Sequence, residues 1–441
     1  MSDPQRDDSP RKASRDDAVA VVRRLRENGH VAYFAGGCVR DQLLGLEPKD
    51  YDVATDAPPD RVRQLFSNTQ AVGAAFGVIL VRHRKSQIEV ATFRTDLQYR
   101  DGRRPEGVVF TTAEEDAKRR DFTINGMFYD PVEEKVIDYV GGRADLQGRL
   151  LRAIGNPRER FGEDYLRLLR AVRFAARFDL EIEPATADAM LKSAGWLSAI
   201  TPERIAEELR LMLAPPTRTR AWPMLWRFKL TDVIFRYLVQ GPVTFKPQSS
   251  LLLALIAANE PITFGLALAA ATLETWLMED AGRDVRARLE PRAVRTMVQA
   301  MRKALRISND ESDEMGDALA GIAPLLADAP PPTLAQKKRF LARPSAASSR
   351  QLLRALGRIG LFQDRVEALE AEFDELAKSE FAPPPLVTGD DLTAAGLQPG
   401  PVFKRVLDAV YDAQLEDRVR TKAEAMELAM KLASSEPPPK L

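Results

Sequence analysis

The chain has 441 residues and carries 64 basic and 64 acidic side chains, so its formal net charge is zero. This balance excludes a basic coat over the whole surface, although it is compatible with a basic stripe along one face. Hydrophobic residues make up 45% of the chain, enough for packed cores in about two to four domains. The single cysteine, Cys38, excludes an internal disulfide and is typical of a reducing compartment.

We expect neither a secretory signal nor a membrane span. Residues 1–17 are polar and of mixed charge, so we expect them to be disordered. The most apolar stretch, 251–258, is followed by Asn259, Glu260 and Pro261, and it is shorter than the about 20 apolar residues that a span needs. We therefore expect a cytoplasmic protein without membrane contact.

A helix, a strand and a glycine turn open the folded part of the sequence. Apolar residues at helical spacing predict a helix over 18–28, and 33–35 is an apolar strand candidate. Gly36 and Gly37 then allow a tight turn and a close approach of the backbone to a bulky group. Residues 39–44 again have helical spacing, so the turn leads into a second helix.

Two aspartates, Asp50 and Asp52, stand at the start of a further predicted strand. Residues i and i+2 of a strand point the same way, so both carboxylates face one spot. A cation between them would relieve their repulsion, and hard oxygen ligands favour Mg²⁺. Mg²⁺ held by carboxylates is common in phosphoryl and nucleotidyl transfer. The alternative is a pair of solvated loop residues, because Asp-x-Asp alone is a common pattern.

The glycine turn and the aspartates together match a known pattern. Backbone N–H groups of the turn can bind phosphate oxygens, and Arg40 beside it is a forked donor for them. Gly-Gly-Cys-Val-Arg-Asp at 36–41 and Asp-Tyr-Asp at 50–52 resemble the first motif of class II tRNA nucleotidyltransferases, the CCA-adding enzymes. Bacterial poly(A) polymerases share this motif within the polymerase-β-like superfamily. The resemblance extends over about residues 20–215.

A carboxylate inside a strand is the third candidate for the metal site. The β-rich runs 77–82 and 88–93 are separated by a polar turn, which predicts a hairpin. Glu89 lies in the second run, where its side chain either points outward or serves the metal. The resemblance implies the second role, because the family carries its third acidic residue on the matching strand.

Polar residues 95–108 are either a solvated loop or the family's loop that helps the enzyme change from adding C to adding A.

The next motif is Arg-Arg-Asp-Phe-Thr-Ile-Asn-Gly-Met at 119–127. Its arginines suit a triphosphate, and an aspartate with an asparagine suits ribose hydroxyls. The alternative is a helix N-terminus capped by Asp121. The segment resembles the family motif Arg-Arg-Asp-Phe-Thr-x-Asn-Ala, which implies phosphate binding by Arg120 and ribose binding by Asp121 and Asn125. Gly126 departs from the usual alanine.

A second decisive stretch covers 161–173. Asp164, Arg167, Arg170 and Arg173 recur every three residues, which predicts one polar ridge along a helix. The ridge is either a salt-bridged solvent face or a reader of bases, since a carboxylate beside a guanidinium can pair with a base edge. The stretch resembles the family motif Glu-Asp-x-x-Arg. The resemblance implies that the aspartate and the first arginine act as a protein template for CTP and ATP, with the other two arginines near the base, phosphates or RNA end.

Strand signals fade from Pro215 onward, and the remaining pattern predicts helices. Seven basic residues concentrate charge between two proline-rich breaks and are either solvated helix faces or a track for tRNA phosphates. They are Lys337, Lys338, Arg339, Arg343, Arg350, Arg354 and Arg358. Residues 386–400 resemble the C-terminal segment of many bacterial tRNA nucleotidyltransferases, which favours tRNA as the partner. With only His30 and His83, the chain cannot carry a histidine-rich phosphohydrolase domain.

The sequence thus predicts an α+β fold, with a polymerase-β-like nucleotidyltransferase head on a mixed sheet and an all-helical neck, body and tail. The expected boundaries are 18–150 for the head, 151–214 for the neck, 215–330 for the body and 331–441 for an RNA-binding tail.

The predicted reaction adds C, C and A to a tRNA 3′ end from CTP and ATP, with Mg²⁺ and release of pyrophosphate. A poly(A) polymerase or an A-only enzyme is the nearest alternative. An inactive RNA-binding protein is the other, and the complete set of motif residues speaks against it.

Overall fold

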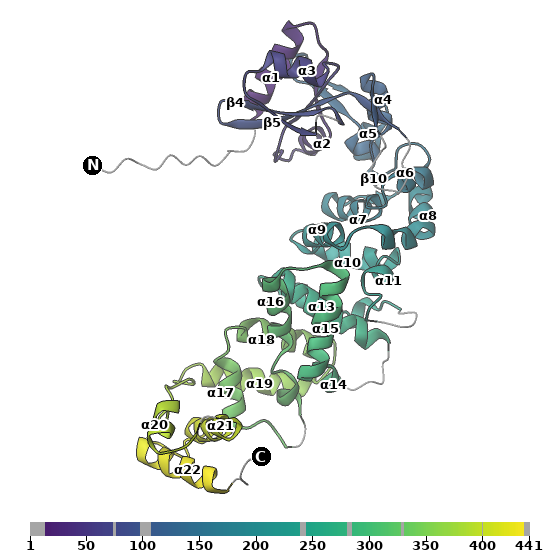
Figure 1. Cartoon of the computed structure of the whole chain (residues 1–441). Coiled ribbons are helices and arrows are strands. Elements are labelled where there is room, and N and C mark those ends of the chain that lie inside the picture. Colours follow the sequence, from purple (N-terminus) through teal and green to yellow (C-terminus); the bar gives the residue numbers. More distant parts are fainter. Residues whose placement is uncertain are drawn as a thin grey trace, which may run out of the picture. The chain divides into compact units, whose positions relative to one another are not determined.

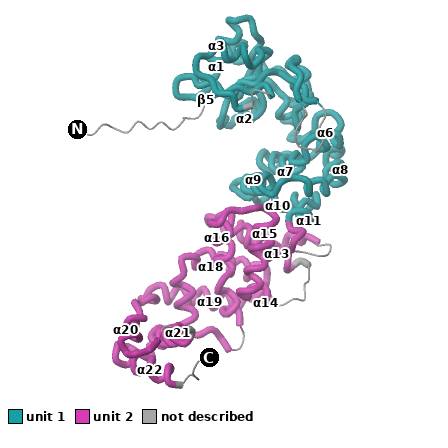
Figure 2. Tube along the Cα trace, viewed as in Figure 1, with its two compact units in different colours: residues 1–234 teal, residues 235–441 magenta. Residues whose placement is uncertain are grey.

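A computed structural model describes most of the chain, and its backbone divides into two compact units, residues 1–234 and 235–441 (Figure 2). The finer boundaries at 150, 214 and 330 stay predictions. The described residues are 14–73, 76–97, 107–238, 244–279, 285–327, 330–398 and 400–435.

The first helix, α1 (Arg15–Glu27), begins earlier than the sequence predicted. Ser14 accepts a hydrogen bond from the backbone N–H of Asp17 at 3.2 Å, which caps the helix. Asp17 in turn accepts from the Ser86 hydroxyl at 2.6 Å. The prediction of disorder is therefore wrong for residues 14–17, and residues 1–13 lie outside the described residues.

Within the described part of the first unit, seven strands form one sheet in the order β3-β4-β5-β2-β1-β8-β9. Strands β2 and β5 pair in parallel and the other neighbours pair antiparallel, so the sheet is mixed and the predicted α+β class is confirmed. The sheet strands are Ala32–Ala35 (β1), Asp52–Thr55 (β2), Thr69–Gly73 (β3), Val78–His83 (β4), Ser86–Thr92 (β5), Phe128–Asp130 (β8) and Lys135–Ile137 (β9). Two small ribbons pair Arg94–Asp96 (β6) with Val108–Phe110 (β7), and Leu150–Leu151 (β10) with Glu181–Ile182 (β11).

Helices lie on both sides of the sheet, and the part of this unit after the sheet is mostly helical. Helices α1 and α3 (Pro59–Leu65) lie on one side of the sheet, and α2 (Gly37–Leu43) lies on the other (Figure 1). Helix α2 follows β1 directly across the glycine turn, as predicted. The remaining helices of this unit are Ala113–Lys118 (α4), Thr123–Asn125 (η2), Gly142–Gln147 (α5), Pro157–Glu163 (α6), Arg167–Phe178 (α7), Pro184–Ser193 (α8), Ala194–Ala199 (η3), Pro202–Leu213 (α9), Arg218–Arg227 (α10) and Thr231–Ile234 (α11).

Every regular element described in the second unit is a helix, which confirms the prediction for the chain after Pro215. Its longest helix, α13, is apolar nearly all round, as expected of a helix buried among others. The helices are Pro247–Ser249 (η4), Leu251–Ile256 (α12), Phe264–Glu279 (α13), Val285–Leu289 (α14), Pro291–Leu305 (α15), Asn309–Leu319 (α16), Ala323–Leu326 (η5), Leu334–Leu341 (α17), Ala346–Arg358 (α18), Gln363–Leu376 (α19), Gly389–Ala394 (α20), Pro401–Leu415 (α21) and Lys422–Ser435 (α22).

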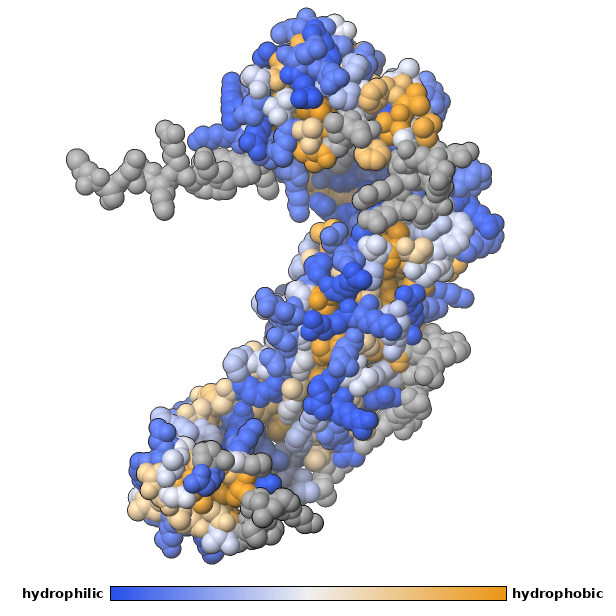
Figure 3. Space-filling model, in the orientation of Figure 1, coloured by the Kyte–Doolittle hydropathy of each residue, from blue (hydrophilic) through white to orange (hydrophobic). Residues whose placement is uncertain are grey.

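The face of the molecule in Figure 3 is largely hydrophilic over both units, with smaller apolar areas between the charged side chains. Among the described residues, no helix combines the length and the apolar character that crossing a bilayer requires.

Candidate active site

One cleft in the first unit, with a volume of about 700 Å³, brings together residues that are far apart in the sequence. Every predicted site residue except Glu89 lines it. Three further residues, Arg119, Phe174 and Arg177, also line it. The predicted residues in its wall are Gly36, Gly37, Arg40, Asp50, Asp52, Arg120, Asp121, Asn125, Asp164, Arg167, Arg170 and Arg173.

The glycine turn lets the backbone pass close to an arginine. Gly36 has a φ of +70°, a conformation that glycine adopts far more easily than other residues. A Cβ atom at Gly36 would lie 3.1 Å from Nη1 of Arg120, so the bulky group that the turn approaches is this guanidinium. The turn and Arg120 thus form one wall of the cleft.

The two aspartates lie at the start of β2. Asp50 precedes the strand, Asp52 is its first residue, and both side chains line the cleft as predicted. Strand β2 runs parallel to β5 with Val53 opposite Val90. Asp52 and Glu89 precede these partners on neighbouring strands and are both exposed, whereas Val53 and Val90 are buried. Glu89 therefore shares the sheet face of Asp52.

Negative charge accumulates around Asp52. Asp52 is open toward the cleft, but protein atoms surround the rest of its carboxyl group. This burial, together with the carboxylates of Glu89 and Asp50, raises the pKa of Asp52 to about 6, although Arg120 acts in the opposite direction. A cation in contact with Asp50 and Asp52 would relieve this repulsion.

A divalent cation therefore fits the donor set of Asp50 and Asp52, which offers hard oxygens and excess negative charge. Among the residues that the structure describes, no three acidic, histidine or cysteine side chains gather closely enough to hold a metal ion. Glu89 as a third ligand stays a prediction, and in this arrangement its side chain lies outside the cleft lining.

Arg40 is buried rather than free to meet a ligand. Its guanidinium is 4.2 Å from the ring centre of Phe178 and donates to Asp41 at 2.6 Å. A second nitrogen, Nη1, donates to Oδ1 of Asn125 at 2.6 Å. These contacts fix the orientation of Asn125, and the predicted role of Arg40 in phosphate binding stays a prediction.

Arg119 and Arg120 are both held by Asp116 of α4, which the sequence did not single out. Oδ1 of Asp116 accepts from Nε of Arg119 at 2.9 Å, and Oδ2 accepts from Nη2 of Arg120 at 2.9 Å. Burial alone would raise the pKa of Asp116, but the two arginines outweigh it and hold that pKa below its usual value. Helical i,i+3 and i,i+4 spacing was the signal that could have identified this contact.

Asp121 connects the two halves of the cleft. Its Oδ2 accepts from Nη2 of Arg170 at 2.7 Å, and its Oδ1 accepts from Nδ2 of Asn125 at 3.0 Å and from the backbone N–H of Phe122 at 2.8 Å. Burial raises the pKa of Asp121, but Arg170, Asn125 and Arg167 outweigh it and lower the value to about 2. Asp121 is therefore ionised at neutral pH, and it pairs with Arg170 of α7.

The ridge predicted over 164–173 is wrong at its first residue. Asp164 lies in the extended junction between α6 and α7, with φ −144° and ψ 106°. Its Oδ1 accepts from the backbone N–H of Leu166 at 3.1 Å, a bond that aspartates make in turns and helix starts. Arg167 pairs with Glu163 instead of Asp164. The three arginines do share α7, and all four predicted side chains line the cleft.

Two residues that sequence reasoning left out of the site lie on the same face of α7. Arg177 follows Arg173 by four residues, and Phe174 follows it directly; both line the cleft. The ring of Phe174 lies 5.1 Å from the guanidinium of Arg170 and 4.3 Å from that of Arg173. Continuing the helical spacing by one turn was the signal for Arg177.

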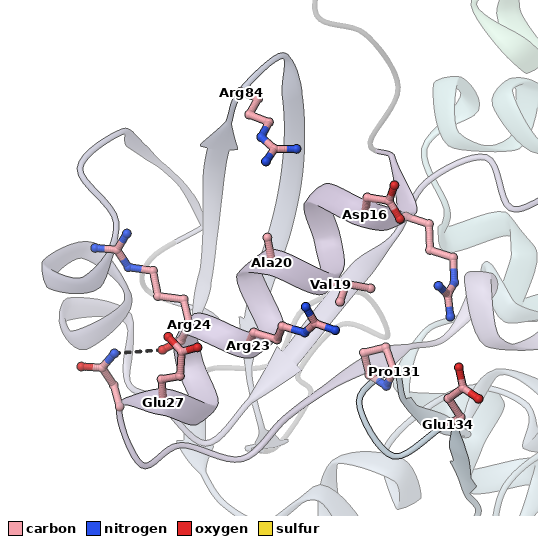
Figure 4. A pocket seen from close by; sticks show the side chains of 11 residues that line it. Asp16, Val19, Ala20, Arg23, Arg24, Glu27, Arg84, Pro131 and Glu134 are labelled. Atoms are coloured by element: carbon pink, nitrogen blue, oxygen red, sulfur yellow. Dashed lines mark hydrogen bonds between the residues drawn. The ribbon is translucent and has the colours of Figure 1, made fainter.

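A second hollow of about 800 Å³ lies over the outer face of α1 (Figure 4). Arg23, Arg24 and Glu27 reach it from α1, and Arg84 reaches it from the tip of the β4–β5 hairpin. Both basic and acidic side chains line it, and no residue of the predicted motifs does. The hollow is therefore separate from the candidate active site.

The predicted loop 95–108 is described only at its ends, where β6 and β7 pair. Residues 98–106 lie outside the described residues, so the proposed part of this loop in changing from C to A stays a prediction.

The seven basic residues proposed as an RNA track are bound within their own unit. Four form ion pairs: Lys337 with Glu372, Arg339 with Asp412, Arg350 with Glu370 and Arg354 with Glu260. Three donate to main-chain carbonyls: Lys338 to Leu415, Arg343 to Ala320 and Arg358 to Ala254. These contacts favour the alternative of paired helix surfaces, and RNA binding by the tail stays a prediction.

A mixed sheet with a glycine turn, two aspartates beside it and an arginine-rich cleft defines a nucleotidyltransferase head. Comparison with protein families agrees. The model described as the poly A polymerase head domain matches residues 32–152. The model described as a probable RNA and SrmB-binding site of polymerase A matches residues 179–240.

Individual relatives distinguish CCA-adding enzymes from poly(A) polymerases by how much of the chain they match. The CCA-adding enzyme of Geobacillus stearothermophilus is 34% identical over 417 residues, which cover 92% of this chain and 94% of that protein. Poly(A) polymerase I of Salmonella typhi is 42% identical, but over 236 residues that cover 51% of each chain. The crystal structure of the Bacillus stearothermophilus CCA-adding enzyme in complex with CTP matches with a TM-score of 0.62 and 30% identity, over 94% of this chain and 98% of that one. The chain belongs to the family of CCA-adding enzymes, which are tRNA nucleotidyltransferases.

Proposed function

We propose that this protein adds C, C and A to the 3′ end of tRNA from CTP and ATP, without a nucleic-acid template. The observation that carries the proposal is the single cleft in which paired aspartates meet the arginines of α7. The CCA-adding relative that matches along 92% of the chain supports CCA addition over poly(A) synthesis, because the poly(A) polymerase matches only about half of it.

In the proposed reaction the RNA 3′-hydroxyl attacks the α-phosphorus of the nucleotide. A bond forms from the hydroxyl oxygen to that phosphorus while the bond to the bridging oxygen breaks. Pyrophosphate leaves, and the hydroxyl proton is released to water. Asp50 and Asp52 would hold Mg²⁺, which when bound supplies charge neutralisation at the phosphates and a more acidic hydroxyl. Arg120 and the backbone of the glycine turn would bind phosphate oxygens. Asp121 and Asn125, already oriented by their mutual hydrogen bond, would bind the ribose.

The choice of nucleotide would come from the protein. A carboxylate accepts and a guanidinium donates, so Asp164 and Arg167 together can match the edge of C or A. Arg170 and Arg173 extend the positive wall of the cleft toward the phosphates or the RNA end. We place the protein in the cytoplasm, where the tRNA 3′ end is its partner and a single unbridged cysteine is expected.

The test is nucleotide-by-nucleotide extension of tRNA that lacks CCA, with CTP alone, ATP alone and both together. Two C residues with CTP alone, and a terminal A only after them, are expected. Asp52→Ala should fold, as judged by circular dichroism, yet release no pyrophosphate with either nucleotide. A long A tail without C would establish the poly(A) polymerase alternative, and unchanged incorporation by Asp52→Ala would refute the role of the aspartates.

A further inference from the structure

Arg160 lies on α6, and its guanidinium binds the end of α4 although Arg160 itself does not line the cleft. Nη2 of Arg160 donates to the carbonyl oxygen of Lys118 at 2.7 Å, and Nη1 donates to that of Arg119 at 2.9 Å. Lys118 is the last residue of α4, and Arg119 is its C-cap. The last carbonyls of a helix have no partner within the helix, so a nearby guanidinium can bind them. Arg160 therefore fixes the point at which α4 ends.

The same guanidinium binds a second stretch of main chain. Nε of Arg160 donates to the carbonyl oxygen of Ile154 at 3.0 Å. The backbone N–H of Ile154 in turn donates to the carbonyl oxygen of Asp121 at 3.2 Å, and the neighbouring Ala153 forms a β-bridge with Phe122. Arg160 thus binds both the main chain that leads into Asp121 and the segment that pairs with it.

The main chain held in this way carries side chains of two parts of the cleft. Arg120 lines the cleft beside the glycine turn, and Asp121 pairs with Arg170 of α7. The Arg160 side chain is only 13% exposed, and Glu163 accepts from its Nη1 at 2.9 Å, so its charge is balanced where it lies. The position of the Arg120 guanidinium relative to α7 therefore depends on how firmly Arg160 holds this segment.

We propose that Arg160 is a positioning residue that sets the spacing between the phosphate-binding and the base-reading parts of the cleft, without touching the nucleotide. The proposal rests on the proposed function, because it assumes that Arg120 binds phosphates and that α7 faces the base. A nucleotide held at both ends binds more tightly than either of its parts, because the second contact forms at a high effective concentration. This gain requires the two parts of the cleft to stand at the distance that the nucleotide spans. Loss of Arg160 frees the end of α4, so that each part still binds its own fragment while the whole nucleotide loses the gain.

Calorimetric titration with three probes, each with Mg²⁺ present, separates spacing from binding at either part. CTP spans both parts, pyrophosphate reaches only the phosphate-binding part, and CMP reaches the base-reading part. Arg160→Gln is expected to weaken CTP binding about tenfold, and the binding of pyrophosphate and of CMP by less than about twofold. A loss of pyrophosphate or CMP affinity as large as the loss of CTP affinity would overturn the proposal. Unchanged CTP affinity in a variant with a lowered melting temperature would also overturn it, because the contact would then be purely structural.

Arg158→Gln is the matched control, because it removes an exposed guanidinium from the same helix by the same chemical change. Its three affinities should equal those of the wild type. Arg160→Lys is the second variant if Arg160→Gln does not fold. It keeps the charge beside Glu163 but has no planar fork to reach carbonyls on two sides, so a fall of about threefold in CTP affinity is expected. Wild-type CTP affinity in whichever Arg160 variant folds would overturn the proposal.

A double substitution tests whether Arg160 acts through the phosphate contact. In an Arg120→Gln background, Arg160→Gln is expected to weaken CTP binding no further, and an additive loss would overturn the proposal. These titrations do not depend on catalysis. A wild-type chain that binds CTP but adds neither C nor A to tRNA would instead contradict the proposed function, so the two failures are distinguishable.

Discussion

At the scale of single residues, the arginines of the cleft are already paired with carboxylates. Asp121 pairs with Arg170, and Asp116 holds Arg119 and Arg120. Buried pairs of this kind add little net stability compared with apolar packing, because both charges lose water. They do fix where a guanidinium points before a ligand arrives. The cleft can therefore present donors to a triphosphate without reorganising at the moment of reaction.

The Asp121 carboxylate makes a pH-dependent contribution to stability. Its pKa is about 2 in the folded chain against 3.8 for an unperturbed aspartate. A lowered folded-state pKa stabilises the protein above the unfolded value, and this stabilisation is lost as the pH falls through the folded value. Asp121→Asn should lower the free energy of unfolding on the order of 2 kcal/mol at neutral pH, and less toward acid.

Urea unfolding of both chains between about pH 7 and pH 3 measures this difference. Asp188→Asn is the control, because Asp188 is exposed and pairs with the exposed Lys192. A difference between wild type and Asp121→Asn that does not shrink on acidification would contradict the assignment of the charge.

The only cysteine of the chain, Cys38, should be inert in the folded protein. Its side chain is buried in α2, and the thiol donates to the carbonyl of Ala35 at 3.3 Å. Burial, reinforced by the Asp52 carboxylate, raises the pKa of Cys38 to about 12, so little thiolate forms at neutral pH. Labelling with a chromogenic disulfide at about pH 8 should be at least about 100-fold slower in buffer than in urea. Fast stoichiometric labelling of the native chain would contradict this burial.

At the scale of elements, the segment after the sheet is held by a close contact between η2 and α5. A Cβ atom at Gly142 would lie 2.1 Å from the carbonyl oxygen of Thr123, and that backbone atom cannot move aside cheaply. Gly142→Ala should therefore destabilise the protein by about 3 kcal/mol, at the upper end for overpacking. Gly195→Ala, at a site with no atom within 4 Å of the added carbon, should cost much less. Calorimetric melting of the two variants tests this difference in stability. Equal melting temperatures would show that η2 and α5 can separate.

Three elements of the cleft could be predicted from the sequence. The glycine turn, the aspartate strand and the arginine helix were identifiable because spacing within one element determines which side chains share a face. The helix boundary at Asp164 was missed because the three-residue period continues across it, while aspartate itself favours a helix start over a helix interior.

Contacts between residues on different elements produce no periodic pattern in the sequence. Arg204 of α9 pairs with Asp164, 40 residues before it. Glu208 pairs with Arg173, 35 residues before it. Residues 201–209 resemble the family motif that follows the template helix, which implies structural support for that helix but does not say which of its residues make the contacts. Only the packing of α9 against α7 makes them partners of the cleft.

At the scale of the whole molecule, the chain has equal numbers of acidic and basic residues. In the second unit, acidic and basic side chains pair with one another. Arg350 donates to both oxygens of Glu370 and to Asp374, and its side chain is 20% exposed. A guanidinium so engaged attracts a phosphate weakly, because the field of the two carboxylates cancels its own. Loss of the Arg350 side chain should therefore change the free energy of unfolding more than the affinity for RNA.

Arg350→Gln should lower the free energy of unfolding by about 1–2 kcal/mol, since it leaves Glu370 and Asp374 without one of their cations. Its affinity for tRNA should change by less than about twofold, because few condensed counterions are released at an already neutralised site. Urea unfolding and filter binding at several salt concentrations, both on the full chain, measure the two effects. Arg418→Gln, which removes a mostly exposed guanidinium paired with Glu416, is the control and should change neither quantity appreciably. A tenfold loss of tRNA affinity with unchanged stability would reverse the conclusion, because the phosphate would then displace the carboxylates and the basic residues between the proline-rich breaks would form an RNA track after all.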